Sequence, residues 1–305
     1  MSVAVEEKLA KIPVVNVLVT ILKRIKLRTF EGLSMYDLME MYVIGIIKGT
    51  LTYRASAISF SFFMAIFPFL LFILNLIPYV PIENFQADFL LFIDNLLPPQ
   101  TNDFFGSIFE DIAKNRRGGL LSTVFVLSIF LMTNGINAIF GGFEISYHVK
   151  TTRNIIKQYF IALGVAVIMA LLLLLAAVIF ISFDVYIVSL LEQQGISRDA
   201  WFITYGKILL FLFITYIAIA ILYYFGTAEG KENSFFSPGA LLTTILFVLT
   251  TYLFGIYIEH FSQYNQLYGS IGGLLIFMLY IWLNSNILLL GFELNASLNS
   301  LKRVL

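Results

Sequence analysis

Residues 161–181 are all apolar or glycine, which is the length and composition of a helix that crosses a lipid bilayer. Five other stretches are nearly as apolar. The sequence therefore predicts six membrane spans, at about 55–77, 120–142, 158–181, 202–225, 238–258 and 270–292. The strands of a membrane β-barrel alternate polar and apolar residues, and the sequence shows no such alternation. We predict an all-α integral membrane protein with six transmembrane helices.

The composition points the same way. Apolar residues make up 59% of the chain and charged residues 12%, which leaves too little polar surface for a water-soluble enzyme or a disordered chain. The 19 basic and 19 acidic residues balance, so no net charge indicates nucleic-acid binding. The chain has no cysteine and two histidines, which excludes disulfides and thiolate sites. We predict no catalytic residue, metal or cofactor, and the oligomeric state stays open.

Lysine and arginine are distributed unevenly between the two sides of the predicted bundle. Fourteen of them fall in the segment before the first span, in the second and fourth loops and in the C-terminal tail, whereas the opposite loops hold four. Because basic residues concentrate in cytoplasmic loops, both termini are expected in the cytoplasm. This divides the chain into a cytoplasmic and interfacial segment (1–54), a six-helix membrane domain (55–298) and a cytoplasmic tail (299–305).

The segment before the first span is amphipathic. Residues 15–25 carry an apolar stripe beside basic residues, which describes either a helix in the membrane interface or one packed under the bundle. The apolar run 12–22 could also be a signal peptide. We expect no cleavage, because the run is short, basic residues follow it and no small-residue cleavage site is present. The amphipathic pattern continues over residues 35–53.

The long external loop, residues 79–118, combines six acidic residues with helical periodicity. Phenylalanines recur on one helical face between residues 85 and 96 and again on a face between residues 105 and 112. Pro98-Pro99 must break the helix between the two stretches. We expect an external αα-hairpin between the first two spans, which either shields the helix ends or gates a cavity.

Five stretches of the sequence carry a family resemblance. They are residues 54–60 (RASAISF), 67–71 (FPFLL), 143–147 (FEISY), 268–273 (YGSIGG) and 289–295 (LLGFELN). Together they resemble the YihY / virulence factor BrkB family of bacterial inner-membrane proteins, over roughly residues 35–300. The family commonly has an asparagine where this chain has Glu144.

The resemblance implies a location in the bacterial inner (cytoplasmic) membrane and a link to envelope phenotypes and serum resistance. It also implies lipid transport, a role suggested for members of the family. An older family label is ribonuclease BN, but a metal-dependent nuclease needs clustered histidine or carboxylate ligands on a basic groove. The two histidines here are about a hundred residues apart and the longest polar loop is acidic, so we discount that label.

Polar residues within or beside the spans are candidate functional residues, because ionisable and amide groups are costly in lipid. The candidates for a cavity or substrate path are Asn134, Asn137, Glu144, Lys207, Asn284, Asn286, Glu293 and Asn295. For some of these a structural role competes: Lys207 can snorkel outward, Glu293 and Asn295 can make structural hydrogen bonds, and the asparagines can join helices. Asn286 and Glu293 lie about 200° around the last helix from Asn284 and Asn295, which predicts a central position for that span.

Small residues and one proline indicate close packing and bending. Gly269 and Gly273 form a small-xxx-small pair, and Pro68 removes a backbone hydrogen bond within the first span. Arg54, at the edge of that span, is expected to anchor it to cytoplasmic headgroups.

Two functional hypotheses follow. The first is a transporter of a lipid or lipid-like envelope amphiphile through a cavity lined by the first, second and sixth spans. The second is a structural or regulatory membrane protein that binds envelope partners through its hairpin and basic N-terminal segment. Membrane lipids are the expected partners in either case, and nucleic acid is not.

Overall fold

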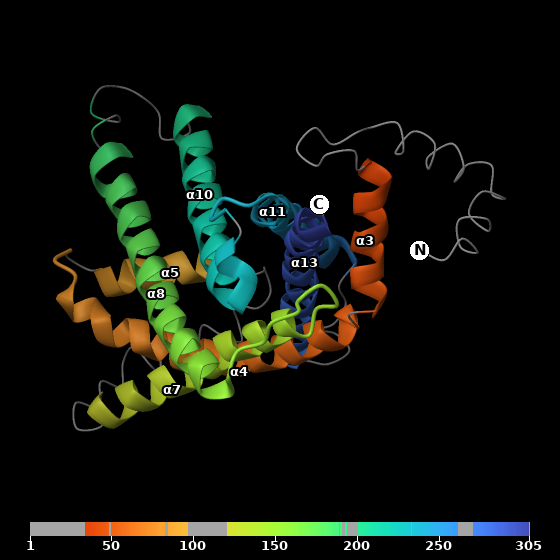
Figure 1. Ribbon diagram of the computed structural model, residues 1–305. Helices are drawn as coiled ribbons and strands as arrows, with labels where there is room; N and C mark the ends of the chain where they lie inside the picture. The colour runs from red at the N-terminus through yellow and green to blue at the C-terminus, as the bar shows by residue number, and fades with distance from the viewer. Residues whose placement is uncertain are drawn as a thin grey trace.

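The computed structural model describes residues 34–48, 50–82, 85–96, 121–188, 190, 193, 201–232, 234–261 and 271–304. These residues are almost entirely helical (Figure 1). The principal helices are α3 (Met35–Lys48), α4 (Leu51–Leu76), α5 (Phe85–Leu96), α7 (Leu121–Glu144), α8 (Ile155–Ser182), α10 (Trp201–Gly226), α11 (Pro238–Phe261) and α13 (Ile271–Val304). Short helical turns η1 (Ile77–Tyr79), η2 (Phe183–Val188) and η3 (Ala228–Glu232) follow α4, α8 and α10.

Six helices, α4, α7, α8, α10, α11 and α13, are long and apolar enough to cross a membrane, which confirms the predicted fold class. The largest difference from prediction is the last helix, which continues from the expected end at residue 292 to Val304. No proline or glycine follows Phe292 to stop it. α8 begins three residues earlier than expected, because the side chain of Asn154 caps it by accepting a hydrogen bond from the Ile156 N–H.

Helices α4 and α7 run side by side along the lower part of Figure 1. Glycines on one face of α7 permit their close approach. A Cβ atom at Gly135 would lie 2.7 Å from Ala65 Cβ, and one at Gly142 would lie 2.7 Å from Ile58 Cδ1. Pro68 is buried within α4, which continues as a single helix to Leu76.

Helix α13 lies in the middle of the bundle, where it contacts α3, α4, α7 and α11 (Figure 1). Its crossing with α11 requires two glycines. A side chain at Gly291 would collide with Thr243 Oγ1, and one at Gly239 would collide with the Gly291 carbonyl. Gly273 is buried in the same helix, whereas Gly269 lies outside the described residues.

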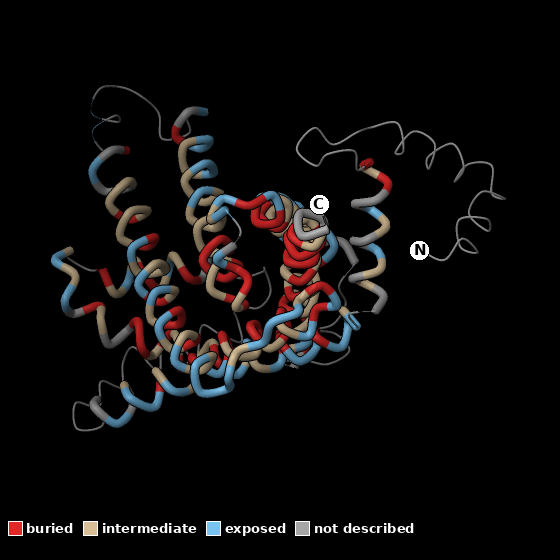
Figure 2. Tube along the Cα trace, viewed as in Figure 1, coloured by how far each residue is buried: buried red, intermediate tan, exposed pale blue. Residues whose placement is uncertain are grey.

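Buried residues line the facing sides of the helices, and exposed ones follow their outer sides (Figure 2). Many of the exposed side chains are large and apolar, including Phe160, Leu209 and Tyr252. Such a surface is suited to contact with lipid tails.

Helix α5 forms the first arm of the expected hairpin. Phe85 and Phe89 are buried, and the Phe92 ring lies 5.6 Å from that of Phe180 on α8. The second arm and Pro98-Pro99 lie outside the described residues, as does the amphipathic segment 15–25. The helical pattern expected over 35–53 is interrupted after α3, since Thr50 adopts a left-handed φ of 49° before α4 begins.

Candidate functional site

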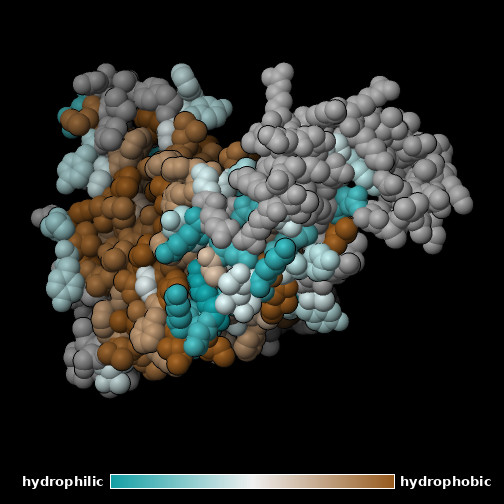
Figure 3. Space-filling model, in the orientation of Figure 1, coloured by the Kyte–Doolittle hydropathy of each residue, from teal (hydrophilic) through white to brown (hydrophobic). Residues whose placement is uncertain are grey.

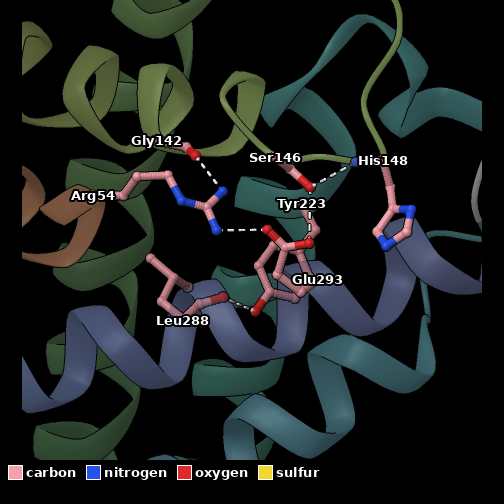
Figure 4. A network of polar contacts seen from close by, with 7 residues as sticks. All are labelled: Arg54, Gly142, Ser146, His148, Tyr223, Leu288 and Glu293. Carbon is pink, nitrogen blue, oxygen red and sulfur yellow. Dashed lines mark hydrogen bonds and ion pairs between the residues drawn. The ribbon is translucent and has the colours of Figure 1, made fainter. Parts of the chain in front are cut away.

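A buried ion pair joins the first and last spans. Arg54 Nη2 on α4 lies 2.5 Å from Glu293 Oε1 on α13, and the two side chains are 2% and 0% exposed. Arg54 Nη1 donates to the Gly142 carbonyl on α7 across 3.0 Å. The Ser146 hydroxyl donates to Glu293 Oε2 across 2.8 Å (Figure 4). One pair of charges therefore holds α4, α7 and α13 together.

The prediction that Arg54 anchors the protein at the membrane surface is wrong. α4 begins at Leu51, which places Arg54 in its first turn, beside the buried Ala55 and on the side facing α13. A buried guanidinium is tolerated only with a counter-charge and hydrogen-bond acceptors. Glu293 and the Gly142 carbonyl provide both.

Three aromatic rings pack beside the ion pair. The rings of Phe143 and Phe292 stack with centroids 4.2 Å apart, and Tyr223 meets them edge-on. The Tyr223 hydroxyl donates to the Leu288 carbonyl across 2.7 Å and accepts a hydrogen bond from Thr243 Oγ1 across 2.6 Å. Aromatic packing and full burial keep Glu293 from any substrate in this conformation, so its role here is to position helices.

Asn295 faces the opposite side of α13 and caps α11. Its Oδ1 accepts from the Gly239 N–H across 2.8 Å, and its Nδ2 donates to Ser237 Oγ across 2.8 Å. The first N–H groups of α11 have no partner within their own helix, so a side chain from α13 supplies one.

The side chains of Asn284 and Asn286 donate hydrogen bonds to backbone carbonyls of their own helix, α13. Their Nδ2 atoms donate to the carbonyls of Tyr280 and Trp282, at 2.9 and 2.7 Å. The Trp282 indole donates to Ser56 Oγ on α4 across 3.2 Å. Both asparagines are half-buried.

Three polar residues on one face of α7 form a different group, and two of them, Asn137 and Glu144, contact α8. Asn134 is exposed near the middle of the α7 span, and Asn137 and Glu144 follow on the same face at half-buried positions. Gln158 of α8 lies beside Asn137 and Glu144. Its Nε2 donates to Asn137 Oδ1 across 3.2 Å, and with the amide group turned over the nitrogen instead donates to Glu144 Oε2 across 2.9 Å. We call Asn134, Asn137, Gln158 and Glu144 the polar ladder.

The loop between α7 and α8, residues 145–154, is held by hydrogen bonds at the Glu144 end of the polar ladder, which we call its foot. The Arg153 N–H donates to Glu144 Oε1 across 3.2 Å, while the guanidinium donates to the Phe225 carbonyl across 2.6 Å and to the Thr227 carbonyl. Glu229 Oε1 accepts from the N–H groups of Lys150 and Thr151, at 3.2 and 3.0 Å. The loop is thereby fixed to the C-terminal end of α10.

Burial lowers the pKa of the Arg153 guanidinium, and the neighbouring Glu144 carboxylate opposes that shift. The guanidinium caps carbonyls at the end of α10, where a cation is favoured by the helix dipole.

The structure thus separates the sequence candidates rather than gathering them around one cavity. Asn137 and Glu144 of the second span lie beside Gln158 of the third span, not beside the first and sixth spans. Lys207 is half-buried on α10, and nineteen residues, about 28 Å of helix, separate it from Gly226 at the end beside the loop. Among the described residues, no group of three histidine, aspartate or glutamate side chains could hold a metal ion.

Sequence reasoning missed Ser146, Arg153, Gln158, Tyr223 and Glu229. A signal existed for Gln158, an amide near the start of an otherwise apolar span. No local signal marks Tyr223, one of sixteen tyrosines, or Glu229, which lies in a short polar loop.

Comparison with known proteins gives a family and several relatives. The sequence model of the family described as "Virulence factor BrkB" matches residues 45–304. The "Putative ribonuclease-like protein YfkH" of Bacillus subtilis is 29% identical over 257 residues, which cover 82% of this chain and 91% of that protein. No solved structure matches.

Two further relatives are named UPF0761 membrane proteins. One from Xanthomonas campestris is 23% identical over 81% of this chain and 57% of its own length. One from Psychrobacter sp. is 24% identical over 90% of this chain and 51% of its own length. The chain spans little more than half of these two proteins.

Proposed function

The chain belongs to the virulence factor BrkB family of membrane proteins, and from that premise we propose that it carries a lipid or lipid-like envelope amphiphile along the polar ladder of α7. The protein is a multi-pass bacterial membrane protein. We place it in the cytoplasmic membrane with both termini in the cytoplasm, on the strength of the fourteen basic residues on that side against four on the other.

The exposed Asn134 is the observation that carries the proposal. It lies near the middle of the α7 span, while Phe130 one turn earlier and Phe160 on α8 present apolar surface. An amide facing hydrocarbon without water is costly, so polar side chains at this depth line a hydrated path or a binding site.

The remaining ladder residues support a path rather than an isolated site. Asn137, Gln158 and Glu144 continue from Asn134 toward the end of α7, where loop 145–154 begins. A head group moving between these amide groups exchanges one set of hydrogen bonds for the next, while its tail stays against the apolar surface of α8. This arrangement lowers the cost of moving a polar head group through the bilayer.

Ribonuclease activity is not part of the proposal. "Ribonuclease-like" describes the Bacillus relative alone. Two histidines far apart in the sequence and an acidic external loop do not supply the clustered metal ligands and basic groove that a metal-dependent nuclease needs.

Lipid movement in reconstituted vesicles tests the proposal. The full chain is placed in liposomes that contain a trace of fluorescent phospholipid, and dithionite bleaches the label in the outer leaflet. We expect bleaching beyond the outer-leaflet half with the unaltered chain, and loss of the excess when Asn134 and Asn137 are both replaced by leucine. Phe130→Leu, on the same exposed face, is the matched control and should keep the activity. Bleaching no greater than in protein-free vesicles contradicts the proposal.

A further inference from the structure

Three exposed lysines lie on the segments that meet where the polar ladder ends. Lys150 lies in loop 145–154, Lys157 in the first turn of α8 and Lys231 in η3. The hydrogen bonds of Glu229 to the loop, and of Arg153 to the end of α10, hold these three segments together. We call Lys150, Lys157 and Lys231 the basic cluster.

Figure 3 shows this region as a hydrophilic band over the loop between α7 and α8, bordered by apolar surface. The apolar border beside Lys157 includes Ile155, Ile156 and Phe160, which are 82%, 66% and 68% exposed. Exposed cations and exposed apolar side chains thus adjoin at the start of one helix. That combination suits an amphiphile at a membrane interface.

Two of the acidic side chains near the cluster, Glu144 and Glu229, are already engaged. Glu144 accepts from the Arg153 N–H, and the buried Glu229 accepts from two loop amides. Four basic and three acidic residues occupy residues 144–158 and 227–237. The lysines of the basic cluster are exposed, so they present positive charge outward.

We propose that the transported amphiphile has an anionic, phosphate-bearing head group, and that the basic cluster binds this head group at the foot of the polar ladder. The inference rests on the proposed function, whose substrate class it defines. The ligand is an anionic lipid of the membrane, with its phosphate at the lysines and its chains against the exposed face of α8. A lysine near an anionic membrane surface contributes about fivefold to affinity.

Because the chain has no cysteine, a single one can report on the site. The exposed Thr152 is replaced by cysteine and labelled with a fluorophore, and the full chain is reconstituted in phosphatidylcholine vesicles. Quenching is measured against the mole fraction of spin-labelled phosphatidylglycerol or spin-labelled phosphatidylcholine. We expect half-quenching at a lower mole fraction of spin-labelled phosphatidylglycerol than of spin-labelled phosphatidylcholine. Each lysine-to-glutamine change in the cluster should raise the phosphatidylglycerol fraction needed about fivefold.

Lys207→Gln is the matched control, because it removes the same charge about 28 Å of helix away from the end that holds the cluster. It should leave the half-quenching fraction unchanged. Equal quenching by the two lipids, or no effect of the triple Lys150→Gln, Lys157→Gln, Lys231→Gln change, overturns the inference.

The dithionite assay with fluorescent phosphatidylglycerol and phosphatidylcholine separates this inference from the proposed function. Selective movement of phosphatidylglycerol that is lost in the triple variant supports both. Equal movement of both lipids, unaffected by the triple variant, overturns the inference and leaves the proposed function standing. Selective binding at the cluster with no movement of either lipid overturns the proposed function, and the substrate assignment with it.

Discussion

Replacing Arg54 by methionine leaves the Glu293 carboxylate buried without its counter-charge. The carboxylate is 0% exposed, and it keeps the hydrogen bond from the Ser146 hydroxyl at 2.8 Å. Breaking a buried ion pair by removing one partner costs about 3–5 kcal/mol. We expect the free energy of unfolding to fall by that amount. Glu293→Leu should lower it by a similar amount, because it leaves the Arg54 guanidinium buried without a counter-charge.

The double variant Arg54→Met/Glu293→Leu removes both charges and should lose much less than the sum of the single changes. The Gly142 carbonyl and the Ser146 hydroxyl each lose a partner in it, at about 1–3 kcal/mol apiece. The single changes together cost about 6–10 kcal/mol and the double change about 2–6 kcal/mol, so the midpoints give a coupling free energy of about 4 kcal/mol.

Reversible unfolding in mixed micelles, followed by circular dichroism, measures these differences. Tyr53→Met serves as the control, because Tyr53 precedes Arg54 on α4 and is 81% exposed; its effect should stay within about 0.5 kcal/mol. Single variants that match this control, or a coupling free energy near zero, would refute the buried pairing.

Packing and capping give two further predictions. Gly135→Ala should lower the free energy of unfolding by about 1–3 kcal/mol, because its Cβ would lie 2.7 Å from Ala65 Cβ. Gly141→Ala has nothing within 4 Å of its Cβ and should be neutral or stabilising. The same unfolding measurement compares the two variants, and equal effects would contradict the α4–α7 crossing. Asn295→Ala should lower the free energy of unfolding by about 1 kcal/mol, because α11 loses its cap, whereas Asn295→Asp keeps the acceptor for the Gly239 N–H. Equal losses of unfolding free energy from the two changes would count against capping.

The helices were predictable because long apolar runs determine them directly. The run 161–181 needs no tertiary information to be read as a span, and α8 contains it. The end of α13 was not predictable from apolarity, because the helix continues past Phe292 through polar residues, one of which, Asn295, caps α11. The position of a span follows from the favourable transfer of apolar side chains to lipid, whereas the end of a helix depends on capping residues and on packing against neighbouring helices.

The candidate site was only partly predictable for the same reason. Glu293 and the asparagines stood out because polar residues are rare in spans. Arg54 was assigned to the surface because an arginine at a span edge is usually there, and its partner is 239 residues away in the sequence. The grouping of Asn137 with Gln158 depends on how α7 packs on α8, which local sequence does not encode.

Aqueous access to Asn134 tests the central claim most directly. In the cysteine-free chain, Asn134→Cys and Phe130→Cys are compared in vesicles for reaction with a charged, membrane-impermeant methanethiosulfonate reagent. The reactive species is the thiolate, which forms where water reaches the thiol. A hydrated ladder predicts fast labelling of the Asn134→Cys variant that phosphatidylglycerol slows, and little labelling of the Phe130→Cys variant. Equally slow labelling of both variants would place Asn134 in dry lipid and contradict the path.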